Sequence, residues 1–186
     1  TKTDGTVGAL ILSYPLLHVT HPDPHGEQLR KMAFVFKAFA AEARKINGCR
    51  VGVFWDYLSL PQKNEEGFDD RTEEERVRFG RALKGINAWY GNQKTTVLRA
   101  TTPLPSGYAY TNSQPYTKRG WCVAERMMSG IVKNDQALLD LSKLSGNENS
   151  VGELRVKGRS NRQAPMAPDV FREMLRVGVD VEKTIT

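Results

Sequence analysis

The chain is poor in cysteine: Cys49 and Cys122 are the only two among its 186 residues. Two cysteines are too few for the disulfide framework that stabilises small secreted domains. Cys122 falls within a predicted helix and Cys49 just before a predicted strand, so we expect both to be free thiols in a reducing compartment. The cysteine content therefore favours an intracellular location, in the cytoplasm or the interior of an organelle.

Long hydrophobic runs are also lacking. No apolar stretch approaches the roughly 20 residues that cross a bilayer, and the start of the chain shows no signal-peptide pattern. We therefore expect no membrane span. Hydrophobic residues make up 39% of the chain and charged residues 26%. This balance is typical of a folded globular domain rather than of a disordered segment.

The basic residues are not concentrated in one place, although the net charge is +6. Lysine and arginine are spread along the chain with acidic residues between them. The densest basic stretch, residues 155–162, contains no aromatic side chain to stack on a base. We therefore do not expect nucleic acid as a partner.

Histidine is scarce, and all three histidines lie in one loop after the first predicted strand: His18, His21 and His25, with Asp23 among them. Imidazole and carboxylate groups are zinc ligands. Their spacing matches no strong zinc motif, however, and the neighbouring prolines indicate a rigid surface loop. We predict no metal site here and retain ligand contact as the other interpretation of the histidines.

The sequence does contain a regular alternation of strand and helix patterns. Apolar runs predict strands at 7–14, 50–56 and 95–101, and helical spacing predicts helices at 28–46, 72–91 and 118–132. The continuous apolar character of 50–56 favours a strand covered on both faces. Strands that alternate with helices predict an α/β fold, with a parallel sheet and helices on both of its faces.

The pattern changes beyond residue 134. Residues 136–144 fit either a strand or a short helix, 146–167 is mostly loop, and Pro168 opens a short helix through Arg176. We expect one α/β domain over residues 1–134, with 135–186 as an extension packed on it.

Polar residues end the first two predicted strands: Ser13 and Tyr14, then Asp56. Ligands of open parallel sheets bind beyond the carboxyl ends of the strands, so these residues are candidate ligand contacts. The residues alone leave alternatives open. Asp56 fits a turn cap equally well, and Tyr14 fits the edge of the core slightly better.

Glu125 is the sharpest candidate for chemistry. It shares a helix face with Trp121 and Met128 at spacings of four and three. A carboxyl group among apolar neighbours has a raised pKa, which is a common property of catalytic carboxylates. The alternative is a surface glutamate paired with Arg119 or Arg126, and the pattern alone slightly favours that alternative.

Three segments, in this order, resemble the Toll/interleukin-receptor (TIR) domain superfamily and its relative, the fungal heterokaryon-incompatibility domain. Residues 11–14 (ILSY) look like the TIR opening strand, and 121–125 (WCVAE) match its Trp-Cys-x-x-Glu pattern. Residues 53–62 (VFWDYLSLPQ) look like the incompatibility-domain motif, in a version associated with protist and algal proteins. The resemblance covers residues 7–133.

The resemblance implies a flavodoxin-like parallel sheet of about five strands. It also implies cleavage of NAD at the nicotinamide–ribose bond, with NAD as the substrate and no cofactor required. Glu125 takes the place of the catalytic glutamate. Trp121 would form a wall of the pocket, and Ser13, Tyr14 and Asp56 would line the opposite side.

The chain departs from the TIR pattern at three places. Pro15 stands where TIR enzymes usually carry a basic residue, the loop after the first strand is long and rich in histidine, and 61–63 (PQK) replaces a glycine-containing loop. Many relatives are scaffolds that self-associate. The alternative function is therefore a non-catalytic interaction module with protein partners or further copies of itself. A nucleoside deoxyribosyltransferase-like enzyme is a third interpretation.

Overall fold

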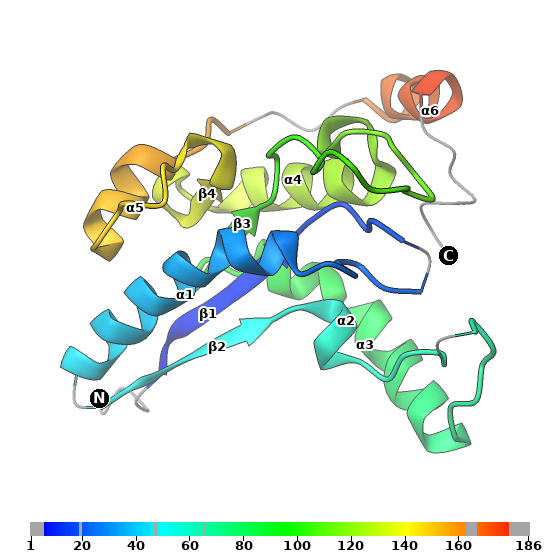
Figure 1. Cartoon of the computed structure of the whole chain (residues 1–186), viewed down its shortest axis with the longest axis horizontal. Coiled ribbons are helices and arrows are strands. Elements are labelled where there is room, and N and C mark those ends of the chain that lie inside the picture. Colours follow the sequence, from blue (N-terminus) through cyan, green and yellow to red (C-terminus); the bar gives the residue numbers. More distant parts are fainter. Residues whose placement is uncertain (1–5, 19, 47, 65, 163–166, 179–186) are drawn as a thin grey trace.

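The computed structural model describes residues 6–18, 20–46, 48–64, 66–162 and 167–178. Its centre is a parallel sheet of four strands in the order β2-β1-β3-β4 (Figure 1). The strands are β1 (Thr6–Ser13), β2 (Arg50–Phe54), β3 (Thr95–Arg99) and β4 (Leu138–Asp140). The predicted α/β class is confirmed. The described residues form four strands instead of about five, in an order that agrees with the first four of a flavodoxin-like sheet.

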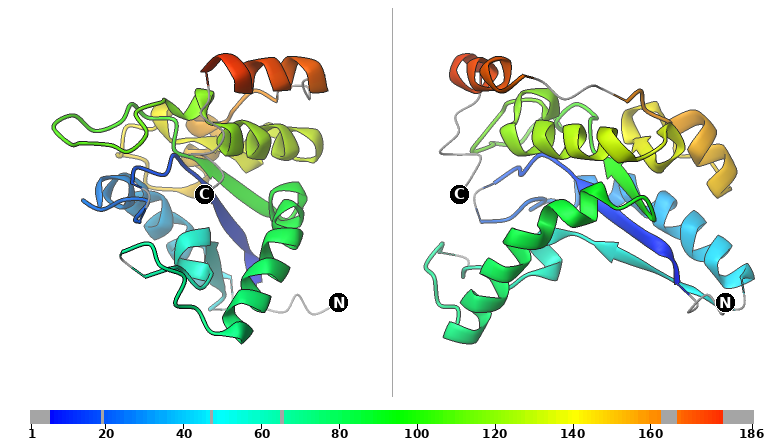
Figure 2. Two further views of the ribbon diagram at one scale, coloured as in Figure 1. Left: turned by 90° about the vertical axis from the view of Figure 1, so that its right-hand side faces the viewer. Right: turned by 180° about the vertical axis from the view of Figure 1, so that it is seen from behind.

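Helices cover both faces of the sheet, as predicted (Figure 2). One face carries α1 (Glu27–Lys45) and α5 (Val151–Gly158), and the other carries α3 (Glu73–Gly91) and α4 (Gly120–Val132). The alternation of side chains along β1 explains the two cores. Leu10 and Leu12 pack toward α1, whereas Ile11 packs against Ile86 and Tyr90 of α3.

The local start and stop signals in the sequence appear as expected. Thr72 and Glu75 form a capping box at the start of α3, because the Thr72 hydroxyl accepts from the Glu75 amide and the Glu75 carboxylate accepts from the Thr72 amide. Helix α1 ends before Gly48, whose φ of +71° suits glycine. The first signal fixes where α3 begins after β2, and the second fixes where α1 ends before β2.

The second strand differs from its prediction. It ends at Phe54, and Asp56 begins the short helix α2 (Asp56–Ser59) instead of ending the strand. The expectation that this strand is covered on both faces is wrong: β2 is an edge strand, and the Val53 side chain is 43% exposed. A continuous apolar run does not distinguish a central strand from an edge strand. An edge strand can be equally apolar even where the neighbouring helices leave some of its side chains exposed.

Residues beyond 134 contribute to the same sheet. The stretch 136–144 holds β4 between two 3-10 turns, and Leu139 of β4 also bridges to Arg159. Helix α5 contacts both α1 and β4. Helix α6 (Pro168–Gly178) begins at Pro168 and continues through Arg176, as predicted.

Two expectations from composition are met by the described residues. Both cysteines are free thiols. No helix in the described ranges is both long and apolar enough to cross a membrane.

Candidate functional site

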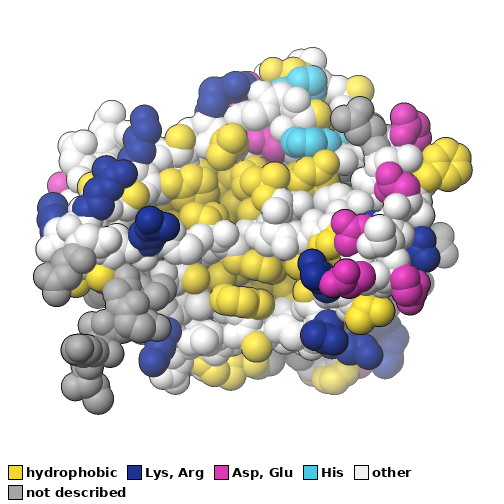
Figure 3. Space-filling model, turned by 90° about the horizontal axis from the view of Figure 1, so that it is seen from below, with side chains coloured by type: hydrophobic (Ala, Val, Ile, Leu, Met, Phe, Trp, Pro, Cys, Tyr) yellow, Lys and Arg dark blue, Asp and Glu magenta, His cyan; other side chains and the backbone are white. Residues whose placement is uncertain are grey.

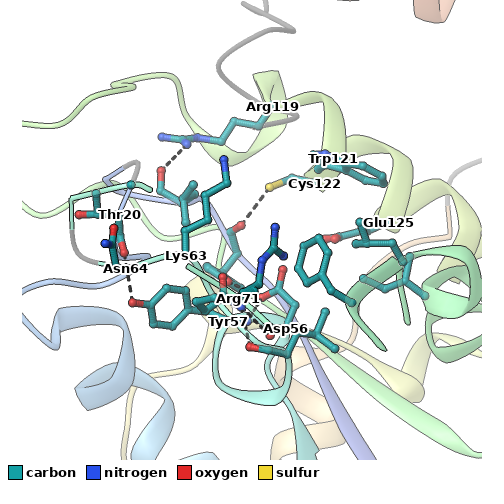
Figure 4. A pocket seen from close by; sticks show the side chains of 18 residues that line it. Thr20, Asp56, Tyr57, Lys63, Asn64, Arg71, Arg119, Trp121, Cys122 and Glu125 are labelled. Carbon is teal, nitrogen blue, oxygen red and sulfur yellow. Dashed lines mark hydrogen bonds between the residues drawn. The ribbon is translucent and has the colours of Figure 1, made fainter. Parts of the chain in front are cut away.

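A cleft of about 530 Å³ opens at the carboxyl ends of β1 and β2. It lies between α3, α4 and the segment that follows β2, and Figure 4 shows its side chains converging from these elements. Its volume lies within the range typical of small-molecule sites. Eighteen residues line it: Tyr14, Leu16, Thr20, Asp56, Tyr57, Leu60, Gln62, Lys63, Asn64, Gly67, Arg71, Phe79, Leu83, Ile86, Arg119, Trp121, Cys122 and Glu125.

Glu125 projects from α4 into this cleft and is partly accessible there. Behind it lies the fully buried Ser13, whose hydroxyl donates to Glu125 Oε2 over 2.5 Å. The Ser13 oxygen is also 2.6 Å from the hydroxyl of buried Tyr116. Because Ser13 has one proton and gives it to Glu125, Tyr116 must donate to Ser13. This chain of hydroxyl groups fixes one oxygen of Glu125 and leaves the other toward the cleft.

The pKa of Glu125 is raised to about 8. Burial, which withdraws water from the charged form, is the main cause, and the negative charge of Asp56 adds to it. The hydrogen bond from Ser13 acts in the opposite direction. The Tyr90 hydroxyl also lies close enough to lower the pKa, but its single proton goes to the Leu12 carbonyl over 2.8 Å, so we assign the direct hydrogen bond to Ser13 alone.

No basic side chain in the described part of the chain pairs with Glu125. Buried Arg119 instead donates to three loop carbonyls, those of Leu16, Asn112 and Gln114, over 2.6–2.8 Å. Arg126 lines a different pocket. The interpretation of Glu125 as a surface glutamate paired with either arginine is therefore wrong.

Asp56 lines the cleft near Glu125 and is tied to the end of β1. The Tyr14 hydroxyl donates to Asp56 Oδ1, and the amide of Tyr57 donates to the same oxygen over 2.7 Å. The Asp56 carboxylate thus accepts from an amide in the first turn of α2 and also lines the cleft. Tyr14 packs edge-on against Trp55, with ring centroids 5.5 Å apart. Burial raises the pKa of Tyr14 well above 10, so it remains a donor.

One wall of the cleft is apolar. Trp121 stands at its rim with 41% of its surface exposed, and the face of α3 supplies Phe79 and Leu83. Cys122 is buried, and its thiol lies 3.3 Å from the Tyr14 carbonyl oxygen, to which it donates. Burial raises the pKa of this thiol well above its usual value, so it is not an activated nucleophile.

Two cations from the segment between α2 and α3, Lys63 and Arg71, also line the cleft (Figure 4). Lys63 is exposed to solvent. Arg71 makes a two-point ion pair with Asp69, at 2.7 and 2.8 Å, and its guanidinium lies 4.3 Å from the centre of the Phe79 ring. The cleft therefore combines the carboxyl groups of Glu125 and Asp56 with the cations Lys63 and Arg71, of which Arg71 is paired with Asp69.

The histidine loop does not form a metal cluster. Within the described ranges, no group of three or more histidine, cysteine or acidic side chains is placed to hold a metal ion. His18 and His21 make short-range hydrogen bonds within the loop, and His25 stacks on Tyr108 with ring centroids 4.0 Å apart. Asp23 accepts from the amide of Leu29 at the start of α1. These residues order the loop that borders the cleft.

The five residues singled out in the sequence meet at this site. Four line the cleft, namely Tyr14, Asp56, Trp121 and Glu125, whereas Ser13 contacts Glu125 from behind. Sequence reasoning missed the supporting hydroxyl of Tyr116 and the cations Lys63 and Arg71. Tyr116 follows a loop rich in proline and glycine, and no local pattern marks its contact with a residue 103 positions away.

Comparison of the chain with protein-family models, curated proteins and solved structures found no match.

Proposed function

We propose that this protein cleaves NAD or a related nucleotide at its N-glycosidic bond, with Glu125 as the catalytic residue. The observation that carries the proposal is the setting of this carboxyl group. Glu125 lies in an open cleft, has no cationic partner among the described residues and is held in place by the Ser13 hydroxyl. Such a group is available to a ligand instead of being used to stabilise the fold.

In the proposed reaction, the bond between ribose C1′ and the nicotinamide nitrogen breaks, and its electron pair leaves with nicotinamide. The ribose becomes an oxocarbenium-like centre, which Glu125 stabilises through its negative charge and its hydrogen bonds to the ribose hydroxyls. Water then adds to C1′ and releases a proton. The products are nicotinamide, ADP-ribose and H⁺, so no redox partner is needed.

The polarity of the cleft supports a ligand with this charge distribution. Trp121 and the apolar face of α3 provide surface for a planar ring next to Glu125. Lys63 supplies positive charge for the diphosphate, and Arg71 adds N–H donors, although Asp69 already offsets the charge of Arg71. They stand in for the basic residue that Pro15 replaces. The positive charge of an N-linked nicotinamide ring beside Glu125 would lower its pKa, and substrate binding would thereby favour the ionised form.

The test is incubation of the purified protein with NAD while nicotinamide release is followed, beside Glu125→Gln and the control Glu74→Gln. Glu74 is an exposed residue of α3, so this control makes the same replacement of a carboxyl group by an amide without touching the cleft. We expect turnover in wild type and control and a loss of about 100-fold or more in Glu125→Gln. Equal activity of wild type and Glu125→Gln would refute the role of Glu125. No turnover at high protein concentration would remove the enzyme proposal.

One observation favours the second candidate, a module that associates with itself. The edge strand β2 leaves Val53 exposed, and Trp89 of α3 is also 43% exposed while it stacks on Phe54 at 5.4 Å. Figure 3 shows hydrophobic side chains gathered across the face seen from below. An open edge strand with apolar neighbours favours strand pairing between copies. Gly52 at the middle of β2 adds no side chain to obstruct a second strand.

A further inference from the structure

A second pocket, of about 370 Å³, opens at the carboxyl end of β3. Five residues line it: Arg99, Arg126, Lys143, Asn161 and Arg162. Four of the five are cationic, and they come from β3, α4, the 3-10 turn after β4 and the segment after α5. Segments distant in sequence thus bring four positive charges to one small volume, although like charges repel.

Arg99 is the deepest of these cations, since only 8% of its side chain is exposed. One Nη of Arg99 donates to the Ser160 hydroxyl and, at 3.4 Å, to Asp140. Its buried Nε–H has no hydrogen-bond acceptor among the described residues. A buried guanidinium N–H without an acceptor is costly, and a bound anion is one way to satisfy it.

Few acidic side chains offset the positive charge of this pocket. Asp140 is the only carboxylate that pairs with a lining residue among the described residues, and it also accepts from the Thr101 and Ser142 hydroxyls. Arg126 is partly buried, and its side chain makes no hydrogen bond or ion pair within the described ranges. Burial first, and then the charge of Arg99, lower the pKa of Arg126.

The other two cations are held in place by neutral partners. Arg162 donates to the carbonyls of Gly130 and Ile131 at the end of α4, over 2.8 Å for both. Lys143 donates to the Arg159 carbonyl over 2.9 Å. These bonds orient the two side chains without neutralising their charge. The pocket is therefore rigid on two sides and retains an excess of positive charge.

We propose that this second pocket binds a phosphate group, either as a free ion or as the phosphate of a small phosphomonoester. The Arg126 guanidinium offers a planar pair of N–H donors that matches two oxygens of a tetrahedral oxyanion. Arg99 and Arg162 add the N–H groups that their protein partners leave over, and Lys143 adds a point charge. Asn161 supplies a neutral donor at the same pocket. The site is separate from the cleft that holds Glu125, and its occupation does not depend on cleavage of any nucleotide.

The experiment measures binding of inorganic phosphate and of phenyl phosphate by calorimetry, at constant ionic strength with chloride as the balancing anion. The proteins compared are the wild type, Arg126→Gln, Arg44→Gln and Lys63→Gln. Arg126 supports nothing else in the described structure, so its replacement should leave the fold intact. Arg44 is exposed at the end of α1 and controls for net charge, and Lys63 controls for binding in the first cleft.

We expect saturable binding of phosphate to the wild type, Arg44→Gln and Lys63→Gln, and a dissociation constant raised about tenfold or more in Arg126→Gln. Binding of phenyl phosphate as well as phosphate would identify a monoester site, and binding of phosphate alone a site for the free ion. The proposal is overturned if wild type binds neither ligand, if Arg126→Gln binds like wild type, or if only Lys63→Gln loses binding.

Discussion

The side chains around Glu125 show how much of a site can be predicted from individual residues in the sequence. Glu125 stood out because its helix neighbours are apolar, and Ser13 because it ends a strand. Their hydrogen bond spans 112 positions and is set by the sheet. Arg119 looked like a partner for Glu125, yet three loop carbonyls take its donors. Sequence spacing places an arginine near a carboxylate but does not show which backbone carbonyls compete for it.

The raised pKa of Glu125 predicts a pH-dependent stability difference between wild type and Glu125→Gln. The pKa is about 8 in the folded protein against 4.5 as the ordinary value, so between these pH values the folded state binds more protons than the unfolded state. The stability of the wild type therefore falls as pH rises across this range. Glutamine keeps the acceptor for Ser13 and does not titrate, so the variant should gain about 2–4 kcal/mol relative to wild type.

Urea unfolding of both proteins at pH 5 and pH 8.5 measures this difference, because the other titrating groups cancel in the comparison. The gain should be seen at pH 8.5 and be largely absent at pH 5. A constant difference at the two pH values would mean that Glu125 titrates normally and that the cleft does not desolvate it.

At the scale of elements, the alternation of strands and helices was predictable because each segment carries its own period and its own end signals. The boundaries of α1, α3 and β3 lie within about two residues of their predicted positions. Features set by neighbours in space were not predictable. The edge position of β2 depends on which strand lies beside it, and the short β4 has three residues, too few to show a period.

Lys133 joins two helices that flank the cleft, and we predict that its replacement destabilises the fold. It follows α4 and is only 1% exposed, and its ammonium donates to the Asn92 carbonyl just after α3 and to the carbonyl and hydroxyl of Thr95 at the start of β3. Methionine would preserve the packing volume but leave these acceptors unpaired. We expect Lys133→Met to lose about 2–3 kcal/mol of unfolding free energy.

Urea unfolding at pH 7 tests this, with Lys37→Met as the control because Lys37 is exposed on α1. The control should lie within about 0.5 kcal/mol of wild type. A Lys133→Met protein as stable as the control would show that the three hydrogen bonds contribute nothing net. In that case the desolvation that lowers the pKa of Lys133 to about 8 offsets them fully.

On the scale of the whole molecule, the two pockets and the open edge lie at different parts of one sheet. The first cleft is at the carboxyl ends of β1 and β2, the basic pocket is at that of β3, and the open edge is the outer side of β2. The opposite edge is partly closed, because Leu139 of β4 bridges to Arg159. Within the described residues, β2 is therefore the more open edge of the sheet, and two copies can pair through it across a twofold axis.

The second candidate function therefore predicts a dimer formed through β2. A lysine on an edge strand opposes strand pairing, because it places charge where the partner strand would bury it. We expect the wild type to self-associate with rising concentration and Val53→Lys to remain monomeric in sedimentation velocity. Val170→Lys on α6, where the valine is 53% exposed, makes the same change in charge away from the edge and should behave like wild type. Equal association of all three proteins, or a wild type that stays monomeric at every concentration, would exclude β2 as a site of self-association.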